Sequence, residues 1–594
     1  MKFSMDIFNQ IKTRIAIAIE ELIQDKKEIE FSVEPPKNQE YGDIATNASM
    51  VIAKSINKKP LDVAEELIDI LKRDNTLMEF VEKFTIANPG FINMYLKSEI
   101  LYYFLNNLNN AGPIIFEKEI NIGLGTKINL EFVSANPTGP MHIGNARSAI
   151  YGNVVSRLLK KCGFDITTEY YINDGGSQTD KLIETLYIRY RQLQGESIEL
   201  PEGCYPGEYV IDTAKQLLAE HGKDLDQFDP KLRKFAIDQM MILIKSNLAS
   251  LGVKHDIFTS EAKLIQDGLV EEAIACLENK GLLYKGILEK PKSDTNQDWE
   301  PREQLLFRST DFGDDSDRAL LKSDGSYTYF ASDVALHLDK IRRGYDQLYL
   351  ILGADHAGYV NRIRASVKAM TDNNMDLNII VNQLVNIYKD GKPIRMSKRK
   401  GNVITVDDVL DEISPDILRF AMLSQKNGTV LDIDCDKLLE KSSDNHLFYI
   451  QYAHTRIVSI IRNGHKYGIF SIDELDIRDI EGQLKYIFKP NNTIDYTLLQ
   501  SEIDLDIIKA LVSFPRLLEL SAKHKEPHRI IYYLYNLAHK LHNLWHMGVV
   551  ENNMRCILDD NIPLSRARIS LIYGLALILS DGLDIFGVQP LLTM

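Results

Sequence analysis

The fold is decided by one stretch of the chain, residues 127–172, which reads KINLEFVSANPTGPMHIGNARSAIYGNVVSRLLKKCGFDITTEYYI. Apolar residues alternate with other side chains from Ile128 to Phe132, which predicts a β-strand, and the prolines of Asn136–Pro140 end it in a turn. Small and apolar residues then recur at helical spacing from about Ile143 to Lys161. A second strand, Ile166–Ile172, completes a strand–helix–strand unit, which predicts a right-handed crossover in a parallel sheet.

A similar pattern returns later in the chain. The apolar run Leu348–Leu352 predicts a further buried strand, which ends in Gly353-Ala354-Asp355-His356. Ligands of open parallel sheets bind beyond the carboxyl ends of the strands, so both polar loops are expected there. The chain is predicted to be multidomain α/β plus all-α. A Rossmann-like parallel-sheet domain with insertions is expected at residues 116–430, an N-terminal α+β domain at 1–115 and a C-terminal helical bundle at 431–594.

Composition narrows the class of protein. The 594 residues carry a net charge of −15, which argues against indiscriminate nucleic-acid binding but allows a specific RNA partner held by local basic patches. The longest strongly apolar stretch, Ile569–Leu579, is short of the ~20 residues that span a bilayer, and the N-terminus lacks the features of a secretory signal. We therefore expect a cytoplasmic protein without a membrane partner. The five cysteines lie far apart, which predicts neither a disulfide framework nor a thiolate zinc site.

The turn after the first strand is the first candidate for chemistry. Pro140-Met141-His142-Ile143-Gly144-Asn145 places an imidazole and a carboxamide near a helix N-terminus, where free amides and the helix dipole favour anions. Gly144 leaves room for a base or ribose to approach the backbone. The alternative is a capped turn with a polar histidine facing water.

The second candidate is a basic loop in an acidic chain. Six of the twelve residues from Lys389 to Lys400 are Lys or Arg. Loops of this kind clamp phosphates and stabilise the charge that develops during nucleotidyl transfer. Alone, the run could equally be a solvated charged surface.

Together the two segments resemble the signatures of a known family. His142-Ile143-Gly144-Asn145 resembles the HIGH motif of class I aminoacyl-tRNA synthetases, and Arg395-Met396-Ser397-Lys398-Arg399 resembles their KMSKS loop. The rest of the sequence resembles the bacterial type of arginyl-tRNA synthetase. The segments that carry this resemblance are Glu131–Pro140, Glu169–Asp174, Tyr205-Pro206-Gly207, Phe312–Asp315 and Gly353–His356. Two positions depart from the motifs, because Asn145 replaces the second histidine and Arg395 the first lysine.

The resemblance implies a reaction and a set of residues for it. ATP would activate L-arginine as arginyl-adenylate, and the arginyl group would pass to the 3′ end of tRNA(Arg). His142, Asn145 and Lys398 would be catalytic. The implied ATP-binding residues are His142, Gly144, Asn145, Asp355, His356, Met396, Ser397 and Lys398. Mg²⁺ is expected with ATP, held by phosphate and water, without a tightly bound metal on the protein. A metal site at His539, His542 and His546 is rejected because no further ligand is evident.

Arginine recognition requires carboxylates in fork geometry, since a guanidinium is planar, always charged and rich in donors. Tyr329 and Asp333 are four residues apart at the start of a predicted helix, hence on one face, and Glu261 follows a strand-like segment. By resemblance these three match the side-chain pocket, Asn136 would hold the α-amino group and Glu131 would support it. The plainer alternative for Tyr329 and Asp333 is a hairpin tyrosine and a helix-capping acid.

The RNA contacts are also implied by the resemblance. Phe91 and Asn93 match N-terminal positions that meet the tRNA, where a ring stacking on an unpaired base beside an amide is sound RNA chemistry. The alternative is a phenylalanine buried in the core. The C-terminal helices would hold the anticodon, and a monomer is expected. Two other classes of protein remain as alternatives: a catalytically impaired tRNA-binding paralogue, or another nucleotidyltransferase on the same fold.

Overall fold

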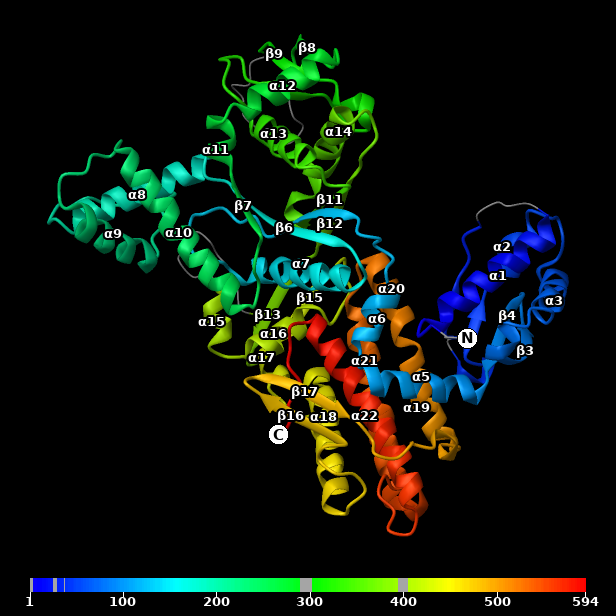
Figure 1. The fold of residues 1–594 in the computed structure, drawn as a ribbon. Helices are drawn as coiled ribbons and strands as arrows, with labels where there is room; N and C mark the ends of the chain where they lie inside the picture. The colour runs from blue at the N-terminus through cyan, green and yellow to red at the C-terminus, as the bar shows by residue number, and fades with distance from the viewer. Residues whose placement is uncertain (1–3, 25–28, 37, 289–301, 394–403) are drawn as a thin grey trace. The chain divides into compact units, whose positions relative to one another are not determined.

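The computed structural model describes residues 4–24, 29–36, 38–288, 302–393 and 404–594. The chain divides into two compact units (Figure 1). One contains residues 1–122, 161–163 and 441–594, and the other contains residues 123–160 and 164–440. Each unit is described by itself below.

The second unit is built on a five-stranded sheet of order β12-β11-β5-β6-β7. Every neighbouring pair is parallel. The strands are β5 (Lys127–Glu131), β6 (Asp165–Ile172), β7 (Ile257–Ser260), β11 (Gln347–Gly353) and β12 (Leu377–Asn382). Between β5 and β6 runs α7 (Ile143–Lys161), so the predicted strand–helix–strand unit is confirmed. The chain passes from β5 to β6 in one direction along the sheet, and from β11 to β12 in the opposite direction. The two strands therefore flank a topological switch point, where such sheets bind ligands.

Helices cover both faces of this sheet. Figure 1 shows α7 on one side and α13 (Tyr329–Arg342) with α14 (Val360–Met370) on the other. Those two helices share a core with α12 (Leu269–Asn279) and with the small sheet of β8 (Leu283–Gly286), β9 (Gln304–Phe307) and β10 (Arg318–Leu321). Buried aliphatic and aromatic side chains fill that core, which fixes the position of α13.

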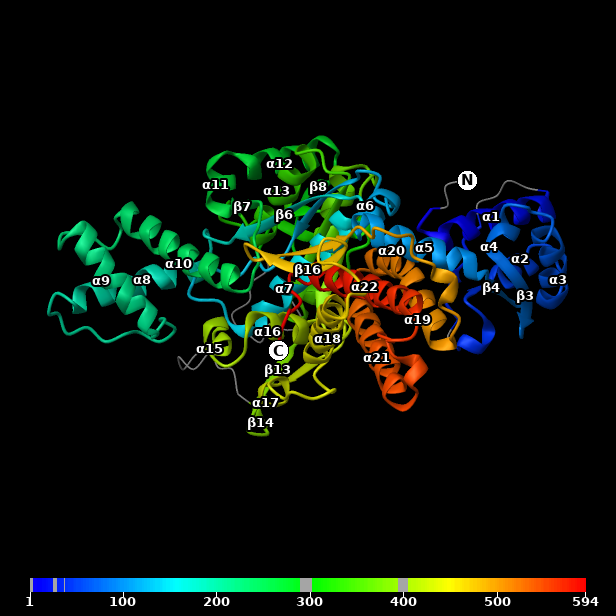
Figure 2. The same cartoon turned by 60° about the horizontal axis from the view of Figure 1, so that its bottom comes forward.

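Two further groups complete the unit. Helices α8 (Ser177–Gln192), α9 (Glu208–His221) and α10 (Pro230–Ser250) pack around their own core and lie together in both Figure 1 and Figure 2. A short α11 (Glu261–Gln266) follows β7. The remaining elements are β13 (Val385–Lys389), β14 (Lys392–Pro393), α15 (Val406–Leu410), α16 (Pro415–Met422), β15 (Leu431–Asp434) and α17 (Cys435–Leu438).

The N-terminal part of the first unit is an antiparallel sheet with helices. The strands β1 (Val33–Glu34), β2 (Ile44–Thr46), β3 (Val81–Ala87) and β4 (Phe91–Leu96) are ordered β1-β2-β4-β3. The helices are α1 (Ile7–Ile23), α2 (Ala48–Ala53), α3 (Pro60–Leu71), α4 (Leu77–Phe80), α5 (Ser98–Ala111) and α6 (Ile114–Glu119). Ile92, Met94 and Leu96 of β4 point into the core, because side chains alternate across a strand.

The C-terminal part is mainly helical, as predicted. Its helices are α18 (His446–Lys466), α19 (Glu502–Val512), α20 (Phe514–His524), α21 (His528–Val550) and α22 (Ile562–Ile585). A hairpin of β16 (Leu475–Ile480) and β17 (Gln483–Phe488) was not predicted, although apolar and charged residues alternate from Leu475 to Arg478 as in a strand. By length and composition, α22 is the one described helix that could cross a bilayer, but 78% of its apolar window is buried within the protein.

Candidate active site

The first signature segment lies beyond the carboxyl end of β5, and it pairs with the chain that follows the second. The Ile143 N–H donates to the Ile404 carbonyl at 3.1 Å, and the Val406 N–H donates to the Met141 carbonyl at 2.9 Å. His142 and Thr405 form an isolated antiparallel bridge between them. Arg395, Met396, Ser397 and Lys398 lie outside the described residues. The segment directly after them is nevertheless held against the His142 turn.

Gly144 is required by the imidazole two residues before it. A Cβ on Gly144 would stand 2.9 Å from both Cε1 and Nδ1 of His142, closer than real side chains approach. The Asn145 N–H donates to the His142 carbonyl at 2.9 Å, so the turn leads directly into α7. The ring of His142 and the half-buried amide of Asn145 thus start this helix together, beside its N-terminal dipole.

Asn247 of α10 is a residue that sequence reasoning missed. Its Oδ1 accepts the Met141 N–H at 2.9 Å, and its Nδ2 donates to Asp407 Oδ2 at 2.8 Å. One buried amide therefore joins the segment before His142 to the segment after the basic loop. No local pattern could have found it, since the partners are far away in the chain.

Three carboxylates that the sequence predicted for the site, those of Glu131, Glu261 and Asp333, lie close together on the face of the sheet opposite α7. Glu261 is the first residue of α11, and only 4% of it is exposed. Its Oε2 is buried without a hydrogen-bond partner among the residues that the structure describes. Burial raises the pKa of the Glu261 carboxyl, and hydrogen bonding by Ser332 and the Gly175 N–H opposes that rise.

Asp333 faces the same cluster from α13. Burial, followed by the charges of Glu131 and Glu261, raises the pKa of the Asp333 carboxyl to about 7, although Arg362 and Lys340 oppose the rise. A carboxyl group whose pKa is raised by neighbouring carboxylates lies in a site short of positive charge. Such a site is suited to a cationic ligand that brings hydrogen-bond donors.

Glu131 already has a cation. It forms an ion pair with Lys340 of α13, and both side chains are almost fully buried. Ser134 Oγ also donates to Glu131 Oε1 at 2.8 Å. Glu131 therefore links β5 to α13, with Lys340 as a partner that the sequence did not reveal.

Tyr329 and Asn136 lie on the open side, next to the start of α8. The Tyr329 hydroxyl is 3.3 Å from Ser177 Oγ, and the residue is 56% exposed. Asn136 Nδ2 donates to Gln178 Oε1 at 2.8 Å. Since α13 begins at Tyr329, that residue and Asp333 stand one helical turn apart on one face, as the spacing predicted.

The backbone between β5 and the turn that carries His142 has an unusual conformation. Val133 and Ser134 have φ values of 73° and 40°, in the left-handed region that β-branched residues rarely adopt. Ser134 Oγ accepts the Tyr171 N–H at 3.1 Å, and the Tyr170 hydroxyl donates to the Ala135 carbonyl at 2.7 Å. These contacts from β6 hold the conformation in place.

Tyr171 is a second residue that sequence reasoning missed. Its hydroxyl is buried and makes no hydrogen bond within the described part of the chain. Burial raises the pKa of the phenol, and the charges of Glu261, Asp333, Glu131 and Asp174 raise it further, in that order. A neutral donor therefore lies within the field of the acidic cluster.

Asp355 and His356 follow β11 at the switch point. They begin the short helix η3 (Ala354–Tyr359), and both are exposed. His356 Nε2 stands 3.5 Å from Asp355 Oδ2. A Cβ on Gly353 would lie 2.5 Å from Asp355 Oδ1, so a larger residue there would displace the Asp355 carboxylate. Both side chains therefore face solvent at the strand end where the fold class binds its ligands.

The two predicted RNA-contacting residues differ in accessibility. Phe91 is 36% exposed at the start of β4, whereas only 2% of Asn93 is exposed. Both lie on the sheet face opposite the core, with Tyr95 farther along the strand. Lys83 Nζ stands 5.2 Å from the centre of the Tyr95 ring on this face. Phe91 is therefore not a core residue, while Asn93 presents little surface.

An aromatic cluster lies between α18 and α21. His542 stands 4.6 Å from the ring of Tyr449 and 5.4 Å from that of Tyr452. The Arg456 guanidinium lies 4.8 Å from the Tyr452 ring and 4.7 Å from the Trp545 ring. His542 thus stacks among aromatic rings. Within the described part of the chain, no group of three His, Cys, Asp or Glu side chains could hold a metal ion.

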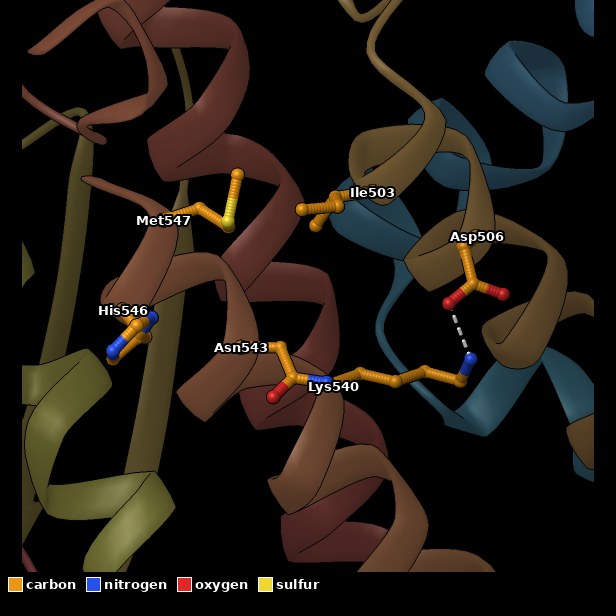
Figure 3. Close-up of a pocket in the computed structure, with 6 residues that line it drawn as sticks. All are labelled: Ile503, Asp506, Lys540, Asn543, His546 and Met547. Atoms are coloured by element: carbon orange, nitrogen blue, oxygen red, sulfur yellow. Dashed lines mark hydrogen bonds and ion pairs between the residues drawn. The ribbon is translucent and has the colours of Figure 1, made fainter. Parts of the chain in front are cut away.

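The opposite face of α21 borders a cavity of about 230 Å³ (Figure 3). Lys540 forms an ion pair across it with Asp506 of α19. Its lining consists of Ile503, Asp506, Lys540, Asn543, His546 and Met547. The face of α21 that lines the cavity differs from the face that carries the aromatic cluster. Lys540, Asn543 and Met547 recur at helical spacing, half a turn from His542 and Trp545.

Comparison with known proteins agrees with this geometry. Residues 117–441 match the family described as tRNA synthetases class I (R), catalytic domain, so the fold and site define a class I aminoacyl-tRNA synthetase. Residues 9–96 match the arginyl tRNA synthetase N terminal domain, and residues 450–594 match the DALR anticodon binding domain. The chain belongs to the arginyl-tRNA synthetase family.

Individual relatives span the whole chain. It is 43% identical to the arginine–tRNA ligase of Wolbachia sp. subsp. Brugia malayi over 99% of each chain. It is 41% identical to that of Roseobacter denitrificans, again over 99% of each. The arginyl-tRNA synthetase structure from Thermus thermophilus covers 99% of this chain and 100% of its own, with a TM-score of 0.69 and 17% identity, and therefore supports the fold.

Proposed function

We propose that the chain activates L-arginine with ATP and transfers the arginyl group to the 3′ end of tRNA(Arg). Membership of the family supports the reaction. The observation that carries the amino-acid specificity is the buried, unpartnered Oε2 of Glu261 near Asp333. A buried carboxylate oxygen without a donor, beside a second carboxyl group, matches a side chain that consists of donors.

In the proposed pocket, Glu261 and Asp333 receive the guanidinium and the Tyr329 hydroxyl adds a polar contact at the open side. Asn136 holds the α-amino group of arginine, and the Glu131–Lys340 pair fixes the strand from which its loop departs. Lysine, with a single ammonium group, would leave carboxylate lone pairs unpaired in a buried site. That cost discriminates against it.

The nucleotide is proposed to bind at the switch point. His142 and Lys398 contact the phosphates as negative charge shifts during adenylation, and Asn145 assists. Gly144 gives the His142 ring room beside the backbone where the nucleotide binds. Asp355 and His356 contact the ribose of the nucleotide, and Met396 and Ser397 belong to the basic segment that carries Lys398. Mg²⁺ enters with ATP as part of the substrate, held by phosphate oxygens and water. Catalysis then consists of positioning and charge stabilisation, because no side chain forms a covalent bond.

The RNA is proposed to bind two surfaces of the first unit. Phe91 stacks on an unpaired base of tRNA, with Asn93 behind it in the sheet. The cluster of Tyr449, Tyr452, Arg456 and Trp545 offers rings and a guanidinium on which anticodon bases can stack. The description of residues 450–594 as an anticodon binding domain supports this assignment. The domain boundaries 1–115, 116–430 and 431–594, a monomeric state and a cytoplasmic location complete the proposal.

One assay tests the proposed function. Pyrophosphate exchange into ATP is measured with each of the twenty amino acids, with and without total tRNA. We expect that only arginine supports pyrophosphate exchange, and that the tRNA is then charged with arginine. Preference for another amino acid, or tRNA binding without any exchange, would contradict the proposal.

A further inference from the structure

The loop after β6 ties down the short helix that carries Glu261. Asp174, which is almost fully buried, accepts the Ser260 hydroxyl on Oδ2 at 2.6 Å and the Ala262 N–H on Oδ1 at 2.8 Å. Ser260 in turn accepts the Lys263 N–H at 3.1 Å. One carboxylate from the loop after β6 therefore accepts hydrogen bonds from both the N-cap hydroxyl and an amide at the start of α11.

Glu261 stands between the two residues that Asp174 holds. Its backbone lies between Ser260 and Ala262, so both of its peptide neighbours are fixed by a single side chain. A helix of one and a half turns has little stability of its own, and its direction depends on such external bonds.

The next residue in the loop shapes the space for the Glu261 side chain. A Cβ on Gly175 would stand 3.3 Å from both Cδ and Oε2 of Glu261. The segment Asp174–Gly175 thus contacts Glu261 from two directions. It fixes the backbone through Asp174, and it leaves a close-fitting gap for the carboxylate at Gly175.

We propose that Asp174 is a positioning residue for amino-acid recognition, which aims the free oxygen of Glu261 at the guanidinium of arginine. The inference rests on the proposed arginine pocket. Asp174 itself does not touch the substrate. It acts through Ser260 and Ala262, and its loss lets α11 turn, so that the Glu261 carboxylate no longer meets a planar ligand in fork geometry.

The chain offers a matched control at the other end of β7. Asp256 accepts the Thr168 N–H and the Thr168 hydroxyl, both on Oδ2 at 2.8 Å. It therefore makes the same kinds of hydrogen bond, one to an amide and one to a hydroxyl, but it holds the beginning of the strand rather than the start of α11. Asp256 is exposed whereas Asp174 is buried, so the loss of Asp256 should cost less stability, and it should leave Glu261 in place.

The experiment compares D174A, D174N and D256A in the full-length enzyme with tRNA and ATP, by arginine-dependent pyrophosphate exchange and thermal melting. D174A is expected to raise the arginine KM by about tenfold to a hundredfold, with the ATP KM within a factor of about two. D174N should restore most of the loss, since its amide oxygen can still accept the Ala262 N–H. D256A should melt at a lower temperature with an unchanged arginine KM.

A further variant, E261Q, separates this inference from the pocket on which it rests. If E261Q raises the arginine KM while D174A changes only the melting temperature, as D256A does, Asp174 is merely structural and the inference is overturned. If E261Q also leaves the arginine KM unchanged, both the pocket and the inference fail. If D174A does not fold, S260A supplies the comparison, because it removes the hydroxyl through which Asp174 holds the start of α11, and a normal arginine KM in S260A overturns the inference.

Discussion

Replacing Asp333 with asparagine tests the centre of the proposed pocket. Asn keeps the shape of the side chain but removes the charge and presents donors to a ligand that has no acceptor in its guanidinium. Truncating one partner of a buried charge pair costs about 2–5 kcal/mol, which corresponds to a loss in arginine affinity of roughly thirtyfold or more. We therefore expect Asp333→Asn to raise the arginine KM by that factor at pH 8.

The pKa of Asp333 makes the prediction dependent on pH. Because burial and the charges of Glu131 and Glu261 raise that pKa to about 7, the free enzyme takes up a proton at Asp333 as the pH falls below 7. The guanidinium binds the ionised form, so the wild-type arginine KM should rise by about tenfold per pH unit below 7. Asn does not titrate, and the difference between variant and wild type should therefore shrink at low pH.

Although Asp333→Asn should weaken arginine binding, it should not lower the stability of the fold. A carboxyl whose pKa is raised on folding stabilises the fold while it is protonated, and this contribution is lost as the pH rises through about 7. The neutral Asn variant should therefore melt at or above the wild-type temperature at pH 8. The assay is pyrophosphate exchange with tRNA from pH 6 to 8.5, with thermal melting alongside. A wild-type arginine KM in the variant, or an unchanged KM for wild type across this range, would refute the reasoning.

Three other changes have definite expectations. Lys398→Ala should lower the single-turnover adenylation rate by about two orders of magnitude with tRNA affinity nearly unchanged, since a charge stabiliser acts mainly in the transition state; unaltered activation would exclude that role. Phe91→Ala should raise the tRNA KM by about tenfold, the loss of one base stack, with little change in melting because the ring is exposed; a lower melting temperature with an unchanged KM would assign the ring to packing. Lys340→Met should leave Glu131 buried without its partner and destabilise the protein by about 3–5 kcal/mol in urea unfolding, whereas a neutral effect would show that Glu131 is solvated or protonated.

The sequence predicted those parts of the fold that depend on local periodicity. The helix from Ile143 to Lys161 and the strands on either side follow from apolar spacing and turn residues, which act within a few positions. The hairpin β16–β17 has a local signal too, since apolar and charged residues alternate before Glu481-Gly482, but this signal is short and lies between long helical patterns, so it was missed.

The residues of the site also differ in whether the sequence alone could identify them. His142 and Gly144 lie within a short motif and could be selected from the sequence, and Tyr329 and Asp333 were selected through the resemblance to the family. Asn247, Lys340 and the hydroxyl of Tyr171 could not, because their importance depends on partners or surroundings brought near only by the tertiary fold. Their residue types are common in helices and strands and carry no local signal.

The left-handed backbone at Val133 has a consequence for how such an enzyme can evolve. A β-branched residue in this conformation costs on the order of 1–3 kcal/mol, and glycine would adopt it without that cost. Selection for heat resistance alone should therefore favour glycine at position 133. Glycine would also let the segment that leads to Asn136 sample other conformations, so selection for accurate charging should oppose the exchange. Position 133 is thus a place where thermostability and fidelity make opposite demands on one residue.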